Sequence, residues 1–332
     1  MWRYTYSQLM DVAMNRIVEC GAHDMVDLGA ETKSQNRINR LYMDRITFEM
    51  RTLKSEWADT GIEFLGKRLP SPIVSCPFAQ AFRLLRTTVG GQAYLLELAR
   101  ATARAQSLFM CSAEPPQLQA IMDEGGLVIP IIKTYTTSAG PEDELMEFYL
   151  RDAERRGALA IGVDIDCFYG EKVGDEWPYG IPLGPKTVQQ LRRYGQITSL
   201  PFVIKGVMSV HDAKVAVEEI GADVLMVGHH FGEIIDYAVP VLKILPDIRS
   251  AVPSIPIIVD TGFMRGSDVL KALALGADLV AVLEPLMLAY IAQGVDGTEE
   301  MFRILNDELR RNMSLTGCKD VASIESSILH FI

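Results

Sequence analysis

The sequence has 332 residues and lacks any apolar run near the roughly 20 residues that a membrane-spanning helix needs. The longest candidate, residues 279–292, is interrupted by Glu284. The opening residues, MWRYTYSQLMD, also lack the apolar stretch of a secretory signal. We therefore expect no membrane partner and a cytoplasmic location.

An excess of basic residues is absent as well. The chain carries 32 basic and 43 acidic residues, which gives a formal charge of −11 at pH 7. A nucleic-acid-binding protein needs a basic face to displace counterions from phosphates, so we expect no nucleic-acid partner. The five cysteines form no CxxC pair, and free thiols in a reducing cytoplasm are expected for Cys20, Cys76, Cys111, Cys167 and Cys318.

What the chain does contain is a repeated pattern. GALAIGVD, GADVLMVG and GADLVAVL each follow a helical stretch, with a glycine suited to end the helix and an apolar run suited to a buried strand. Similar runs give eight candidate strands, which start near 72, 107, 128, 159, 201, 223, 256 and 279. Eight such units predict an α/β fold, a closed (β/α)₈ TIM barrel.

The main alternative is a doubly wound open sheet that binds a dinucleotide. That fold calls for GxGxxG after its first strand, whereas PIVSCPFAQAF contains no glycine. We expect one domain, with an N-terminal helical extension (1–70), the barrel (71–296) and C-terminal helices (297–332), and with a final helix that opens at Thr298 and closes near Gly317.

Polar side chains follow the apolar strands of the predicted barrel. The C-terminal ends of barrel strands carry the chemistry in this fold, and the residues there include Lys133, Tyr135, Asp164, Asp166, Lys205, His229, His230 and Asp260. A single histidine is usually a surface or core residue. A histidine pair opposite an aspartate is a better acid/base candidate, and we favour His229.

Two other chemistries are weaker interpretations. Metal binding would use His, Asp and Cys, but adjacent histidines on an extended segment point apart, and no HxH or HExxH spacing occurs. We therefore predict no metal. Nucleophilic catalysis by Cys76 or Cys111 is disfavoured because buried strand cysteines are mostly inert.

The second half of the chain resembles a known family. Residues 200–324 include LPFVIKGVMSVHDAKVAVEEIGADVLMVGHHFGEIID, PIIVDTGFMRGSDVLKALALGADLVAVLEP and ELRRNMSLTGCKDVASI. These segments resemble the FMN-dependent 2-hydroxy acid oxidases and dehydrogenases, whose members include glycolate and lactate oxidases. Weaker similarity in LGKRLPSPIVSCPFA, PIIKTY and GVDID extends the resemblance over about residues 65–325, and the shorter bacterial members are most similar.

The resemblance implies catalytic roles and a cofactor. The base of the family motif S-N-H-G-G-R falls on His229, its aspartate partner on Asp164, a substrate-facing tyrosine on Tyr135, and a lysine at the flavin N1/O2 edge on Lys205. A small-molecule substrate with a CH–OH group is implied, and FMN is the implied cofactor. Its contacts would come from Pro77, Phe78, Ala79, Cys111, Lys133, Lys205, Asp260, Gly262, Met264, Arg265 and Glu284.

The chain departs from the family pattern at the substrate carboxylate. The arginine after H-G-G falls on Gly232, a second arginine aligns most nearly with Lys172, and a tyrosine of the N-terminal helices falls near Ile17. The two glycines of the motif fall on His230 and Phe231. Because lysine does not replace the bidentate fork of arginine, a simple 2-hydroxy monocarboxylate such as lactate is a poor candidate substrate.

The phosphate end of the flavin site departs too. Met264 and Glu284 replace two arginines. The carboxylate of Glu284 would repel the phosphate unless it turns away or pairs with a cation, and Arg265 or a neighbour could supply that cation. Two functions of different class stay open: a flavoenzyme with a rebuilt substrate pocket, and a flavin-free barrel that acts as a binding or non-redox acid/base protein. A scaffold role is neither supported nor excluded, and the resemblance also implies a homotetramer.

Overall fold

The computed structural model describes residues 3–26, 29–79, 83–89, 93–112, 117–136, 143–166 and 183–332. Eight parallel strands form a ring in the order β4-β11-β10-β9-β8-β7-β6-β5. They are β4 (Ile73–Ser75), β5 (Leu108–Cys111), β6 (Leu127–Lys133), β7 (Ile161–Asp164), β8 (Phe202–Lys205), β9 (Val224–Val227), β10 (Ile257–Val259) and β11 (Leu279–Val282). A parallel bridge between Phe78 and Cys111 joins β4 to β5. The predicted barrel and its eight strands are confirmed.

The apolar runs form strands because they are buried on both faces. One set of side chains fills the inside of the ring, including Val74, Met110, Ile129, Val203 and Met226. The alternate residues pack outward against the helices. The glycines that open the repeated segments, Gly157, Gly221 and Gly276, have φ of +82°, +84° and +107°, which fits the expected left-handed helix ends.

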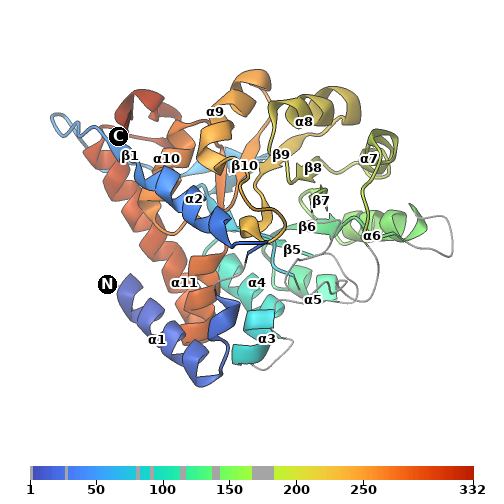
Figure 1. The fold of residues 1–332 in the computed structure, drawn as a ribbon, viewed down its shortest axis with the longest axis horizontal. Coiled ribbons are helices and arrows are strands. Elements are labelled where there is room, and N and C mark those ends of the chain that lie inside the picture. Colours follow the sequence, from blue (N-terminus) through green and yellow to red (C-terminus); the bar gives the residue numbers. More distant parts are fainter. Residues whose placement is uncertain are drawn as a thin grey trace.

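Helices surround the ring (Figure 1). They are α3 (Arg83–Val89), α4 (Tyr94–Arg104), α5 (Gln117–Asp123), α6 (Asp143–Arg155), α7 (Val188–Gly195), α8 (Val210–Lys214) with the π-helix Val215–Ile220, α9 (Val241–Ala251), α10 (Gly266–Ala274) and α11 (Glu284–Leu315). Helix α11 is interrupted at Gln293 and Gly294, whose φ and ψ are not helical. Its second part therefore begins a few residues before Thr298, where the final helix was predicted to open, and it ends before Gly317 as expected.

The first 70 residues contain strands as well as the predicted helices. Helix α1 (Tyr6–Glu19) lies along α11 (Figure 1), while α2 (Ser34–Asp44) packs against α9. Strand β1 (Ile46–Phe48) pairs with β12 (Leu329–Phe331), and β2 (Ile62–Phe64) forms a hairpin with β3 (Lys67–Leu69). Three-residue strands are too short to show an alternating pattern, which explains why the sequence did not reveal them.

The hairpin and α2 lie toward opposite ends of the ring. Phe64 and Leu69 of the hairpin are buried against the inner core of the barrel. Helix α2 instead contacts the segments that follow β9 and β10, through Gln35 and Asn39. Within the described ranges, no helix has the length and apolar character needed to cross a membrane.

Candidate active site

The C-terminal strand ends surround a cavity with about 840 Å³ of empty volume. Nine predicted site residues line it: Pro77, Phe78, Ala79, Lys133, Asp164, Lys205, Asp260, Gly262 and Glu284. The cavity also takes in residues that were not predicted as contacts, including Ser112, His230, Phe231, Glu233 and Thr261. These residues lie within six positions after the end of a strand, so their place in the chain was the available signal.

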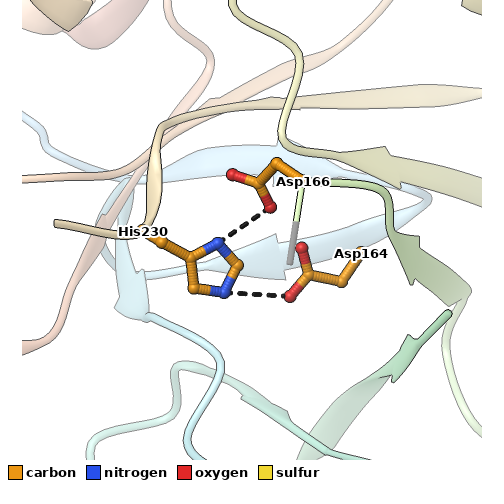
Figure 2. A group of neighbouring side chains, drawn as sticks. All are labelled: Asp164, Asp166 and His230. Atoms are coloured by element: carbon orange, nitrogen blue, oxygen red, sulfur yellow. Dashed lines mark ion pairs between the residues drawn. The ribbon is translucent and has the colours of Figure 1, made fainter. Parts of the chain in front are cut away.

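The floor of the cavity is a cluster of charged side chains from four neighbouring strand ends. Lys133 at the end of β6 places its Nζ 2.7 Å from Asp164 Oδ2 at the end of β7. Lys205 at the end of β8 places its Nζ 3.3 Å from Asp164 Oδ1. After β9, His230 Nε2 lies 3.2 Å from Asp164 Oδ2 and His230 Nδ1 lies 2.8 Å from Asp166 Oδ1 (Figure 2).

Burial and mutual attraction fix the charges in this cluster. Burial disfavours a charged Lys205, but the carboxylates of Asp164, Asp166 and Asp260 outweigh it and raise the lysine pKa. Burial likewise opposes the His230 cation, yet Asp164 and Asp166 raise the pKa of His230 well above its usual value. The pKa of Asp164 lies well below its usual value because His230, Lys133 and Lys205 outweigh its burial.

The prediction that His229 rather than His230 faces Asp164 is wrong. The backbone turns left-handed directly after β9, with φ of +49°, +53° and +75° at His230, Phe231 and Gly232. This turn carries the side chain of His230 into the cavity. Non-glycine residues rarely adopt such φ values, and they concentrate at functional sites.

His229 instead points toward the N-terminal extension. Its Nε2 lies 3.2 Å from Nε2 of Gln35 on α2, and its main-chain N–H donates to Thr261 Oγ1 at 3.3 Å. Its Nδ1 is buried with no hydrogen-bond partner in the described part of the chain. Burial lowers the pKa of His229, which favours a neutral ring packed between α2 and the strand ends.

Asp164, Asp166 and His230 offer ligand atoms within 4.8 Å of one another, a spacing that could hold a metal ion. The ammonium groups already present argue against one. Lys133 and Lys205 lie within ion-pair distance of these carboxylates, at 2.7 and 3.7 Å, and a metal cation would face two fixed positive charges. The cluster is therefore better described as a network of protein charges.

Tyr135, expected to face the substrate, is not among the described residues that line the cavity. Its N–H donates to the carbonyl of Lys133 at 2.8 Å, and this tight turn bends the chain immediately after β6. The ring of Tyr135 is 2% exposed and lies 5.7 Å from the ring of Tyr149 on α6. The turn thus directs Tyr135 into the layer of helices.

Three other predicted cofactor contacts, Cys111, Met264 and Arg265, also lie outside the cavity lining. Cys111 is fully buried in the wall of the barrel at the bridge to Phe78. Arg265 does not supply the cation for Glu284, because its guanidinium lies 3.0 Å from Glu308 on α11 and 4.0 Å from the ring centre of Tyr6. Its partners hold it away from the cavity.

Glu284 lines the cavity at the first turn of α11. No hydrogen bond or ion pair of its carboxyl group occurs among the described residues. Burial raises the pKa of Glu284, with no cation to oppose the effect. This end of the cavity therefore carries an unpaired acidic group.

The position of His230 changes the match to the S-N-H-G-G-R motif by one residue. The two glycines then fall on Phe231 and Gly232, and the arginine falls on Glu233, which lines the cavity. Lys172 lies outside the described residues, and Ile17 is buried in α1. No arginine lines the described part of the cavity, so a carboxylate replaces the expected guanidinium.

Comparisons with known proteins agree with this architecture. The chain is 30% identical to 4-hydroxymandelate oxidase of Amycolatopsis orientalis, over 96% of this chain and 97% of that protein. It is 28% identical to L-lactate oxidase of Lactobacillus jensenii, over 94% of this chain and 82% of that protein. A crystal structure of a mandelate oxidase variant with 2-hydroxy-phenylacetamide superposes with a TM-score of 0.84 at 29% identity, covering 99% of this chain and 98% of that one.

The family described as FMN-dependent dehydrogenase matches residues 14–191 and 182–331. These two segments include every strand of the barrel and every residue of the charged cluster. The resemblance seen in the sequence is confirmed, and the chain belongs to the FMN-dependent dehydrogenase family.

Proposed function

We propose that this protein is an FMN-dependent oxidoreductase that oxidises the CH–OH group of a 2-hydroxy acid derivative. Family membership and the oxidases among its relatives support the cofactor and the reaction, rather than a flavin-free barrel. The observation that carries the proposal is the buried cluster of His230, Asp164 and Lys205 at the floor of the cavity.

The residues present fit a flavin ring. Lys205 is 3% exposed and brings a buried ammonium to the cavity, where it would favour negative charge on a bound ring. Pro77 and Ala79 line the wall beside it, and the positive φ of Thr261 and Gly262 turns the main chain toward the cavity. FMN bound here would accept the α-hydrogen of the substrate together with its electron pair.

The phosphate end is less favourable. Glu284 contributes a carboxyl group where the family has an arginine, and Arg265 is held by Glu308. The phosphate would therefore depend on main-chain N–H groups near Gly262 and Phe263 and at the start of α11, which suit an anion. We expect FMN to bind more weakly than in a relative that has both arginines.

In the proposed mechanism His230 is the general base. Its imidazole removes the proton of the substrate hydroxyl, and a carbonyl forms as the α-hydrogen leaves the adjacent carbon with its electron pair. Asp164 orients the ring and stabilises the imidazolium that results. Lys205 would supply a fixed positive charge next to the base, with its Nζ 3.2 Å from His230 Nδ1. Tyr135 and His229 lie outside the cavity lining, and we assign neither of them to the chemical step.

The substrate differs from a simple 2-hydroxy monocarboxylate. Glu233 stands at the motif position of the carboxylate-binding arginine, so no guanidinium is available there to bind a substrate carboxylate. Phe231 adds an aromatic ring beside the base. We therefore propose a 2-hydroxy ester or amide, in which the group next to the CH–OH is neutral.

The proposal extends to the cellular location and the oligomeric state of the enzyme. Cys20, Cys76, Cys111 and Cys318 carry free thiols, which supports a cytoplasmic location. The family resemblance supports a homotetramer. Size-exclusion chromatography with light scattering checks this assembly: a mass four times that of the chain is expected, and a monomeric mass contradicts it.

The function is tested by loading the purified protein with FMN and measuring reduction of an artificial electron acceptor. Matched pairs of 2-hydroxy acids and their methyl esters or amides serve as substrates. We expect turnover of at least one member of the panel, with a higher kcat/KM for the neutral derivative of each pair. Bound FMN without turnover of any compound would contradict the proposed reaction.

A further inference from the structure

A second carboxylate contacts the histidine of the charged cluster. Asp166 lies two residues after Asp164, just beyond the end of β7. Its Oδ1 is 2.8 Å from His230 Nδ1, while Asp164 Oδ2 is 3.2 Å from His230 Nε2. Figure 2 shows the imidazole between the two carboxyl groups, with one ring nitrogen directed at each.

The neighbouring backbone leaves space for Asp166. Gly206 follows β8 with φ of +99°, and a Cβ at this position would lie 2.6 Å from Cγ of Asp166. A side chain here would therefore collide with the carboxyl group. The side chain of Asp166 is only 15% exposed, and Lys205 Nζ lies 3.7 Å from its Oδ1. The contact between Asp166 and His230 is thus enclosed on the β8 side.

We propose that Asp166 is a positioning residue that, together with Asp164, places a carboxylate at ion-pair distance from each ring nitrogen of His230 and sets the pH at which this histidine accepts a proton. The proposal rests on the proposed function, because it concerns the residue that serves there as the base. It adds a residue to the catalytic machinery that neither the motif nor the pairing of Asp164 identifies.

The chemistry of the ring explains the effect. Each ring nitrogen lies at ion-pair distance from a carboxylate, which stabilises the cationic form of the ring. Each also lies near an ammonium group, with Lys133 Nζ 2.9 Å from Nε2 and Lys205 Nζ 3.2 Å from Nδ1, and these two charges oppose the cation. A cationic ring cannot take a proton from the substrate until it has lost one. A rise in pH that removes the proton should therefore increase activity.

The groups facing His230 oppose one another. Asp164 and Asp166 stabilise the imidazolium from the β7 side, whereas Lys133 on β6, Lys205 on β8 and burial of the ring destabilise it. The charge of His230 also lowers the pKa of the neighbouring His229. Burial raises the pKa of Asp166 itself, and Asp164 adds to the effect, while His230 and Lys205 oppose it. Removing Asp166 should leave the effect of the two lysines less compensated and so lower the pKa of His230.

The test is a proton NMR titration of the histidine C2–H signals in wild-type protein and in Asp166→Asn. The chain has only five histidines, and His230→Gln assigns the relevant signal. A carboxylate at this distance shifts a titration by about 1–3 pH units, so we expect the midpoint of His230 to fall by about one unit or more. An unchanged midpoint in a folded variant overturns the proposal.

The matched control is Asp212→Asn. Asp212 Oδ1 lies 3.0 Å from His211 Nδ1, a similar contact, but the two side chains are 54% and 83% exposed. Because this exposed pair lies outside the cavity lining, Asp212→Asn should leave the midpoint of His230 unchanged. A shift of the His230 midpoint in Asp212→Asn as large as in Asp166→Asn would overturn the proposal.

Asp166→Ser serves if Asp166→Asn fails to fold, and the same fall in the midpoint is expected. In protein loaded with FMN, the acidic limb of the kcat/KM profile should move to lower pH by the same amount as the midpoint, a change that a purely structural role would not produce. The NMR titration needs no flavin. Absence of turnover at every pH therefore contradicts the proposed function, while an unchanged titration contradicts the role of Asp166.

Discussion

Replacing Glu284 should strengthen FMN binding, in the direction opposite to most substitutions in a binding site. The carboxyl group of Glu284 lines the cavity where the family places a phosphate-binding arginine, and it has no ion-pair partner among the described residues. Two unit charges about 4 Å apart interact by about 4 kcal/mol at an effective dielectric constant near 20. Protonation of Glu284 relieves part of this repulsion, so we expect Glu284→Gln to tighten FMN binding by roughly 10- to 100-fold at pH 8, about 1.4–2.8 kcal/mol.

The effect of Glu284 on FMN binding should depend on pH. Burial raises the pKa of Glu284, so the group is neutral at low pH and becomes an anion as the pH rises through that pKa. The ratio of FMN affinities between Glu284→Gln and the wild type should therefore grow from pH 5 to pH 8. Taking the ratio cancels the titration of the phosphate itself, which has a pKa of about 6.

Fluorescence titration of the apoprotein measures both affinities, and riboflavin is the matched control ligand. Riboflavin lacks the phosphate, so its affinity should be nearly the same for the wild type and for Glu284→Gln. The double variant with Met264→Arg and Glu284→Arg should bind FMN more tightly still. The reasoning is refuted if Glu284→Gln binds FMN no better than the wild type at pH 8, or if riboflavin gains as much as FMN.

Two further predictions concern stability. Asp268 is 2% exposed and accepts hydrogen bonds from Arg40 at 2.8 and 2.9 Å, so Asp268→Ala should lower the free energy of unfolding by about 3–5 kcal/mol in urea denaturation. Asp44→Ala, which removes the exposed partner of Arg40, should cost less than about 1 kcal/mol. Equal losses in the two variants would contradict this difference. The raised pKa of His230 stabilises the fold below its unfolded-state pKa of about 6.5 and loses this contribution as pH rises through the folded-state value. Wild-type stability should therefore fall with pH relative to His230→Gln, and parallel pH profiles would contradict the charge assigned to His230.

The barrel could be predicted because its signals are local. Gly157, Gly221 and Gly276 end helices immediately before apolar runs, and such runs form strands wherever both faces are buried. The same regularity placed Asp164 and Lys205 correctly at strand ends that meet around the cavity.

The errors arose where the chain leaves this regular pattern. Which histidine enters the cavity depends on left-handed φ values from His230 to Gly232, which the residue types there did not reveal. The tight turn that places the ring of Tyr135 beside Tyr149 is equally irregular. Arg265 forms a salt bridge with Glu308, a residue 43 positions later on α11, and no local pattern indicates such a contact.

The central claim is that a flavin in this cavity is reduced by a substrate whose hydroxyl proton passes to His230. Its most direct test is anaerobic bleaching of the visible flavin spectrum after FMN-loaded protein is mixed with 2-hydroxy acids, esters and amides. We expect at least one compound to bleach the wild type. His229→Gln should bleach at nearly the wild-type rate, and His230→Gln should be slower by about 10²–10⁴-fold, as for loss of a general base. Equal bleaching rates in His230→Gln and the wild type, or slow bleaching in His229→Gln alone, would contradict the account.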